Sequence, residues 1–188
     1  MEIALKIIIF GSLALFALLF VFSLVIFAVH HRTGGALFVP TPKAIIRTII
    51  KEIDFSRFHD IRDIGAGDGR FMSAVEREYG VSVRGYEINP IAFVLAKVLL
   101  LNRKSSVLFK DFWNEDFSGA DCVYCYLFPD LMRRLGEKLS RELPDGAMVI
   151  SANFPVPFWK EERIIKASGT IFNDPVYVYR MSGHTPED

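Results

Sequence analysis

The chain has 188 residues, with 22 basic and 22 acidic side chains and therefore no formal net charge. This balance creates no overall electrostatic field that would attract nucleic acid, so we expect no nucleic-acid partner. When an apolar N-terminal segment is set aside, about 155 residues remain. That is the size of one domain, and it leaves no room for a separate substrate-recognition domain.

The first segment is strongly apolar. Residues 7–29 form a run of 23 residues without a charged side chain. A helix of that length spans a hydrocarbon core of about 30 Å. A cleaved signal peptide has a shorter apolar core and ends in small residues, which residues 27–31 do not offer. We therefore expect residues 1–32 to form an integral, single-span membrane anchor. Basic residues follow it at Arg32, Lys43, Arg47 and Lys51, which predicts that the domain faces the cytoplasm.

Helical and extended patterns alternate after a proline-punctuated linker at 33–42. The apolar spacing predicts helices at 43–53, 70–79, 90–101 and 129–142, and strands at 60–64, 81–87, 106–110, 121–127, 147–153, 161–168 and 175–181. The alternation predicts an α/β domain over 43–181, with a Rossmann-like, doubly wound, mostly parallel seven-stranded sheet. Because the last two strands have no long helix between them, we expect an antiparallel hairpin at the edge. Residues 182–188 are predicted to be a flexible tail.

The loop after the first strand carries glycines at alternate positions, Gly65, Gly67 and Gly69, with Ala66 between the first two. Glycines allow a backbone to approach a ligand closely, and a helix that begins just after them presents free N–H groups. A dinucleotide motif would place its third glycine three residues after the second, and that position is Arg70. The spacing therefore favours S-adenosylmethionine as the cofactor rather than NAD.

Acidic residues end the first two strands of the predicted sheet. Asp63 precedes the glycine loop, where its carboxylate could position the cofactor's ammonium directly or through the loop, although it could also only form the turn. Glu87 lies 20 residues after Gly67, which suits a carboxylate that accepts both ribose hydroxyls. Asn89 is grouped with these candidate cofactor residues, and we expect it to act as the N-cap of the next helix rather than as a ligand.

Two further candidates follow the third strand. Asp111 could accept a hydrogen bond from the adenine amino group, and Phe112 could pack on the ring. Aromatic residues after a short strand are as often part of the core. Cys122 and Cys125 have the spacing of a redox motif, but residues three apart in a strand point to opposite faces. They are therefore predicted to be unpaired core residues, and the sequence shows no metal-binding pattern.

The motifs DIGAGDGR, GYEINP, KDFW and DCVYCYLFP, taken in this order, resemble those of class I S-adenosylmethionine-dependent methyltransferases over nearly all of residues 36–181. The apolar segment, VPTP at 39–42 and the run at 142–157 resemble more specifically the small membrane-anchored lysine methyltransferases. In mitochondria, members of that family methylate the ATP synthase c subunit and the adenine nucleotide translocase. Because no mitochondrial presequence is visible ahead of the apolar segment, we expect a prokaryotic member that methylates a lysine of a membrane-embedded protein.

The resemblance also indicates where the methyl acceptor enters. It implies that residues 39–42 close over the entrance, where Thr41 would make a polar contact; a stiff linker is the alternative. Tyr126 could contact the incoming amine and Phe128 could line the site, although both could equally be ordinary core residues. Enzymes that methylate the exocyclic amines of bases usually carry Asp or Asn at the start of this motif, and Tyr126 stands there instead. This departure supports the expectation that nucleic acid is not the substrate.

Two other functions remain open from the sequence. The chain could methylate a lipid or another small apolar molecule at a membrane. It could also be a cofactor-binding scaffold without activity.

Overall fold

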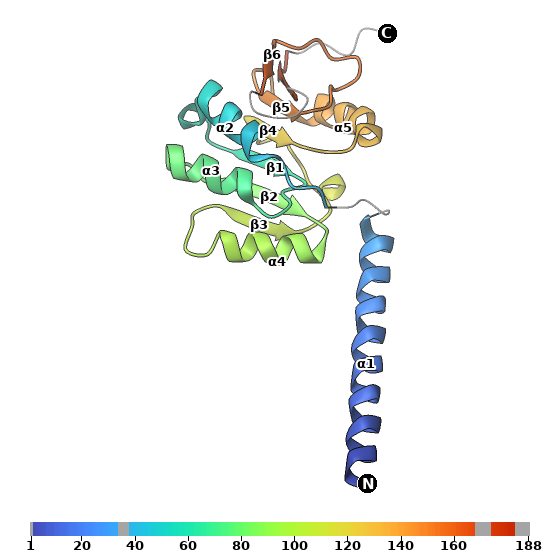
Figure 1. The fold of residues 1–188 in the computed structure, drawn as a ribbon. Helices are drawn as coiled ribbons and strands as arrows, with labels where there is room; N and C mark the ends of the chain where they lie inside the picture. Colours follow the sequence, from blue (N-terminus) through green and yellow to red (C-terminus); the bar gives the residue numbers. More distant parts are fainter. Residues whose placement is uncertain (1, 34–37, 168–173, 183–188) are drawn as a thin grey trace. The chain divides into compact units, whose positions relative to one another are not determined.

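The computed structural model describes residues 2–33, 38–167 and 174–182 (Figure 1). The chain divides into two compact units, and the second begins at Phe38. The predicted linker at 33–42 and tail at 182–188 lie partly outside the described residues.

The first unit contains one helix, α1 (Glu2–Thr33). Its described large apolar side chains are exposed, from Ile9 to Leu24. They point in every direction around the axis, as expected when nearly all residues of a helix are apolar. In the ranges that the structure describes, no helix has the length and apolar content required for a membrane crossing. The single-span membrane anchor expected at 1–32 is thus not supported by the described residues.

The second unit is built on a seven-stranded sheet in the order β3-β2-β1-β4-β5-β7-β6. The strands β3, β2, β1, β4 and β5 are parallel to one another, whereas β7 runs antiparallel to both β5 and β6. Their bounds are β1 Ile61–Ile64, β2 Val83–Glu87, β3 Ser106–Phe109, β4 Cys122–Cys125, β5 Met148–Ala152, β6 Arg163–Lys166 and β7 Pro175–Arg180. The predicted sheet, with its antiparallel edge, is confirmed.

Helices cover both faces of this sheet (Figure 1). Buried side chains of α2, α3 and α4 pack in one apolar core, and those of α5 pack in a second core on the other face. The helix bounds are α2 Lys43–Glu52, α3 Arg70–Tyr79, α4 Pro90–Leu99 and α5 Pro129–Glu142. This arrangement is the doubly wound α/β sandwich that alternating strands and helices predict.

Short helical turns were not predicted from the sequence. They are η1 (Phe55–Arg57) and η2 (Phe112–Asn114), and in each the residue before the turn, Asp54 or Asp111, accepts a backbone N–H with its side chain. Cys122 and Cys125 are both free and buried, which confirms that they do not pair.

Candidate active site

The glycine loop joins β1 to α3 at the carboxyl edge of the parallel strands. Gly65, Gly67 and Gly69 have φ angles of 71°, 57° and 78°, a region that side-chain-bearing residues rarely adopt. The backbone N–H groups of Gly65 and Ala66 both donate to the carbonyl of Tyr86, at 3.0 and 2.9 Å. The three glycines are therefore required by the turn itself, and β2 holds the turn in place.

Glu87, at the end of β2, closes this loop from the other side. Its carboxylate accepts the backbone N–H of Gly67 at 2.8 Å and that of Asn89 at 2.7 Å. Burial raises the pKa of Glu87, and the backbone N–H donors partly oppose that rise. Each carboxylate oxygen has a second lone pair. Glu87 can therefore order the loop and still accept ribose hydroxyls.

Asp63 is the most unusual side chain of the site. It is 1% exposed, and its Oδ2 has no hydrogen-bond partner among the described residues. Burial first, and then the nearby carboxylates of Glu87 and Asp68, raise the pKa of Asp63 well above its ordinary value. A buried carboxyl oxygen without a hydrogen-bond partner is costly unless a ligand supplies that partner.

This carboxyl group fits a cationic cofactor. S-adenosylmethionine carries an ammonium and a sulfonium, and a positive charge beside Asp63 would offset both its burial and its repulsion by Glu87. The residues present therefore suit this cofactor: Asp63 for its ammonium, Glu87 for its ribose, and the backbone of residues 65–69 for close approach.

Asn89 caps α4, because its Oδ1 accepts the backbone N–H groups of Ile91 and Ala92 at 3.0 and 3.3 Å. The expectation that it acts as an N-cap is confirmed. Asp111 likewise accepts the backbone N–H of Trp113 at 3.0 Å, and Phe112 is buried in the second core. Contacts of Asp111 and Phe112 with the adenine remain predictions.

Hydrogen bonds connect the segment 38–42 to β4 and to Arg70, the first residue after the glycine loop. The Thr41 hydroxyl lies 3.2 Å from the hydroxyl of Tyr124 on β4. The Thr41 carbonyl accepts a hydrogen bond from Nη1 of Arg70 at 2.9 Å, and Arg70 also forms an ion pair with Asp68 at 2.6 Å. Thr41 is itself buried. It therefore ties the segment down, and no described contact places it at a reacting atom.

Phe38 reaches the centre of the loop. A Cβ added to Gly67 would lie 2.6 Å from Cε2 of the Phe38 ring. The segment that begins at Phe38 therefore packs directly on the loop. That residues 39–42 close over the entrance remains a prediction.

The two candidate acceptor residues follow the end of β4. Tyr126 is half-buried and Phe128 is 41% exposed, just before Pro129 begins α5. Burial, and to a smaller extent the charge of Asp174, raises the pKa of Tyr126, so its hydroxyl keeps its proton at neutral pH. Tyr126 and Phe128 thus follow β4, the strand that pairs with β1, and their contacts with an acceptor remain predictions.

Sequence reasoning missed three contributors to this arrangement. Tyr124 is paired with Asp63 in the register of β4 on β1, and its ring stacks on Phe71 at 3.8 Å. Period-two alternation could have placed Tyr124 on the same face of β4 as Cys122 and on the opposite face from Cys125. Phe38 and the role of Arg70 carry no local signal, because their partners are distant in sequence.

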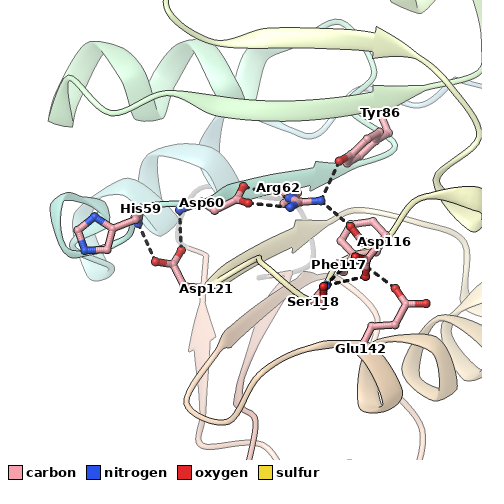
Figure 2. Close-up of polar contacts among 9 residues, drawn as sticks. All are labelled: His59, Asp60, Arg62, Tyr86, Asp116, Phe117, Ser118, Asp121 and Glu142. Carbon is pink, nitrogen blue, oxygen red and sulfur yellow. Dashed lines mark hydrogen bonds and ion pairs between the residues drawn. The ribbon is translucent and has the colours of Figure 1, made fainter.

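Figure 2 shows a second polar cluster around Arg62 of β1. Because neighbouring residues of a strand point to opposite faces, Arg62 and Asp63 lie on opposite faces of β1. Arg62 donates to the hydroxyl of Tyr86 at 3.0 Å and to the carbonyl of Asp116 at 2.7 Å, and it forms an ion pair with Asp60 at 2.7 Å. The Tyr86 carbonyl accepts hydrogen bonds from the glycine loop, and the Tyr86 hydroxyl accepts one from Arg62. This cluster therefore helps to fix Tyr86, and through it the loop.

Together, the glycine loop, the two strand-end carboxylates and the seven-stranded sheet define a class I S-adenosylmethionine-dependent methyltransferase. A family model described as the ANTKMT methyltransferase domain matches residues 63–163. The chain belongs to this family.

Known relatives agree with this assignment. A protein-lysine N-methyltransferase of Saccharolobus islandicus (strain REY15A) is 29% identical over 152 residues, which cover 78% of this chain and 94% of that protein. The adenine nucleotide translocase lysine N-methyltransferase of Mus musculus is 34% identical over 128 residues, 66% of this chain and 54% of that protein. The chain thus spans about half the length of the mouse relative.

A solved structure shares the fold. The crystal structure of an RNA methyltransferase from Salinibacter ruber in complex with S-adenosyl-L-homocysteine superposes with a TM-score of 0.69 and 28% sequence identity. The match covers 80% of this chain and 98% of that one. A complex with the demethylated cofactor supports the choice of cofactor made from the glycine spacing.

Proposed function

We propose that this enzyme transfers the methyl group of S-adenosylmethionine to the ε-amino group of a lysine in a protein. The observation that carries the proposal is that Tyr126 and Phe128 follow β4, the strand paired with β1, with no acidic or amide side chain between Tyr126 and Pro129. The archaeal relative, which is named for protein lysine methylation and is matched over 94% of its length, supports it.

The residues of this chain have mainly a binding and aligning role. The bound cofactor supplies an activated methyl group, and the transfer forms a nitrogen–carbon bond while the sulfur–carbon bond breaks. A lysine amine has an ordinary pKa of about 10.4, so it must lose a proton before it attacks. The apolar ring of Phe128 beside the amine favours its neutral form, and water takes the proton. The Tyr126 oxygen accepts a hydrogen bond from the neutral amine and directs its lone pair towards the methyl group.

We further propose that the acceptor protein is associated with a membrane and that α1 holds the enzyme there. A helix whose apolar side chains point in every direction needs an apolar environment, and those of α1 are exposed in the chain. Holding the enzyme and its acceptor at one surface raises their effective concentration.

RNA is the second candidate acceptor, because the Salinibacter ruber relative is named as an RNA methyltransferase. The balanced charge of the chain and the apolar residues after Tyr126 favour protein.

One labelling experiment separates the acceptors. Membranes from the source organism are incubated with the enzyme and S-adenosylmethionine labelled in its methyl group, and protein, RNA and lipid are then extracted separately. We expect the label in protein and, after acid hydrolysis, in methyllysine. Glu87→Ala, which removes the loop's carboxylate partner, should abolish labelling. Label in RNA or in lipid would refute the proposal, as would labelling that persists with Glu87→Ala.

The role of α1 has its own test. Replacing Leu15 and Leu19 with Lys places charges among exposed apolar side chains, whereas replacing both with Ala keeps the helix apolar and serves as the matched control. We expect the Lys variant to leave the membrane fraction and to label membrane protein poorly, with unchanged affinity for S-adenosyl-L-homocysteine. If the Lys variant sediments with membranes as the Ala variant does, α1 is not the holding element.

A further inference from the structure

Helix α4 exposes apolar side chains that a soluble surface helix would replace with polar ones. Only Ala92 and Ala96 of this helix are buried. The spacing of five exposed side chains places them along one side of the helix. Together with Leu101, two residues beyond the end of α4, they form what we call the α4 face: Ile91, Val94, Leu95, Val98, Leu99 and Leu101, each between 42% and 66% exposed. A contiguous apolar patch of this kind marks an interaction surface.

The segment around the α4 face is basic in sequence, although Lys110 is paired with Glu115 at 2.9 Å. Residues 88–110 contain four basic residues, Lys97, Arg103, Lys104 and Lys110, and no Asp or Glu. Glu76 reaches this segment from α3, but its carboxylate accepts the backbone N–H groups of Lys104 and Ser105. Lys97 and Arg103 are both exposed.

We propose that the α4 face binds the surface of a membrane that contains anionic lipids. Apolar side chains flanked by Lys and Arg are the combination that lies at the boundary between acyl chains and acidic headgroups. Packing against a second copy suits this face less well. A two-fold interface would bring the face against itself and place like charges together.

The position of α4 gives this contact a consequence for the enzyme. The helix starts directly after Asn89, whose backbone N–H is bonded to Glu87. Ile91, at the first turn of the α4 face, therefore lies next to the cofactor residues in the chain. Docking through α4 would hold the site beside the bilayer surface. This inference concerns the methyltransferase domain and does not depend on the nature of the acceptor or on α1.

The test uses the full chain with one environment-sensitive nitrobenzoxadiazole label. The label is placed at Val98→Cys on the α4 face or, as a matched control, at Glu161→Cys, an exposed site in the segment leading to β6. The two native cysteines are fully buried, and burial raises the pKa of Cys125 to about 12, so they react poorly. Because both labelled proteins carry the same α1, a difference between them reports on α4.

On vesicles of phosphatidylcholine with phosphatidylglycerol, we expect the label at 98 to shift to shorter wavelength and to be quenched by spin-labelled acyl chains. The label at 161 should do neither, and vesicles of phosphatidylcholine alone should produce a much weaker effect. Replacing Lys97 and Arg103 with Gln in the V98C protein should raise the amount of anionic lipid needed by about 25-fold, or roughly fivefold for each basic side chain. A label at Leu101→Cys repeats the measurement should V98C misfold.

Three results would overturn the proposal. The label at 98 could stay in water on anionic vesicles, or it could respond equally on neutral ones. It could also shift without lipid in proportion to protein concentration, which would identify a second copy as the occupant. None of these results would affect methyllysine formation, so this proposal and the proposed function fail separately.

Discussion

Replacing Gly67 with Ala tests whether the segment at Phe38 packs on the glycine loop. Two separate penalties apply at this position. The φ angle of 57° is one that a residue with a Cβ adopts at a cost, and the new Cβ would lie 2.6 Å from the Phe38 ring. Real Cβ contacts are not that short, so either the ring or the loop must move.

The two penalties can be given magnitudes. The left-handed backbone costs Ala about 1–2 kcal/mol, and the displaced ring adds about 1–3 kcal/mol. Gly80 is a matched control, because its φ is 69° and nothing lies within 4 Å of an added Cβ. For a domain of this size, 1 kcal/mol lowers Tm by about 2–4 °C. We therefore expect Gly80→Ala to lower Tm by about 2–8 °C and Gly67→Ala by about 4–20 °C.

The assay is thermal unfolding of four proteins that form a double-mutant cycle: wild type, Gly67→Ala, Phe38→Ala and the double variant. With Phe38 truncated, the Gly67→Ala penalty should fall to that of Gly80→Ala, since only the backbone cost remains. Calorimetric titration with S-adenosyl-L-homocysteine follows the loop itself. If Gly67→Ala has the same cost with and without the Phe38 ring, this reasoning about the segment is wrong.

Three further predictions concern the groups around the loop. Without cofactor, the raised pKa of Asp63 means that the folded enzyme holds this proton more tightly than the unfolded chain does. The free energy of unfolding should therefore fall as pH rises from about 4 through the raised pKa; Asp63→Asn should reduce that fall in urea titrations and leave only the part that comes from Glu87, whose pKa is also raised. Cofactor affinity should show the opposite trend and weaken as pH drops, because the neutral carboxyl cannot pair with an ammonium, and calorimetry on Asp63→Asn should show a flat profile. Tyr124→Phe should cost about 0.5–1.5 kcal/mol of stability by removing the hydrogen bond to Thr41, and a Thr41→Val background should reduce that cost; additive losses would mean that the two hydroxyls are not coupled. Arg62→Met should cost about 1–3 kcal/mol in urea unfolding because it leaves the Tyr86 hydroxyl and an acidic partner without their donor, and an unchanged midpoint would contradict this supporting role.

Helices that are bounded by Gly or Pro could be predicted from the sequence with the correct terminal residues. Helix α3 runs from Arg70 to Tyr79 as expected, because glycines flank it, and α5 starts at Pro129 as expected. Strand ends were less accurate. The predicted strand at 121–127 pairs only over Cys122–Cys125, because its neighbours β1 and β5 stop pairing there. A strand end is set by its partners, and a single sequence contains no information about them.

The residues of the candidate site also differ in how well the sequence predicts them. The glycine loop and Glu87 were predictable because spacing along the chain determines their relation. Contacts across the fold were not: Thr41 and Tyr124 are 83 residues apart, and Arg70 was noted only because it is not a glycine. The burial of Asp63 also depends on all the surrounding elements. Long-range packing is therefore the part of this site that the sequence did not reveal.

The place of β7 in the sheet has a consequence for synthesis. β5 pairs with β4 on one edge, but the strand on its other edge is β7, which is formed last and lies between β5 and β6. During translation, the backbone N–H and C=O groups on that edge of β5 therefore stay without strand partners until residues 175–180 have left the ribosome. An unpaired edge is open to pairing with other chains. Translation that stalls before β7 would thus release a nascent chain with an open, aggregation-prone edge, although the glycine loop and both strand-end carboxylates had already been made.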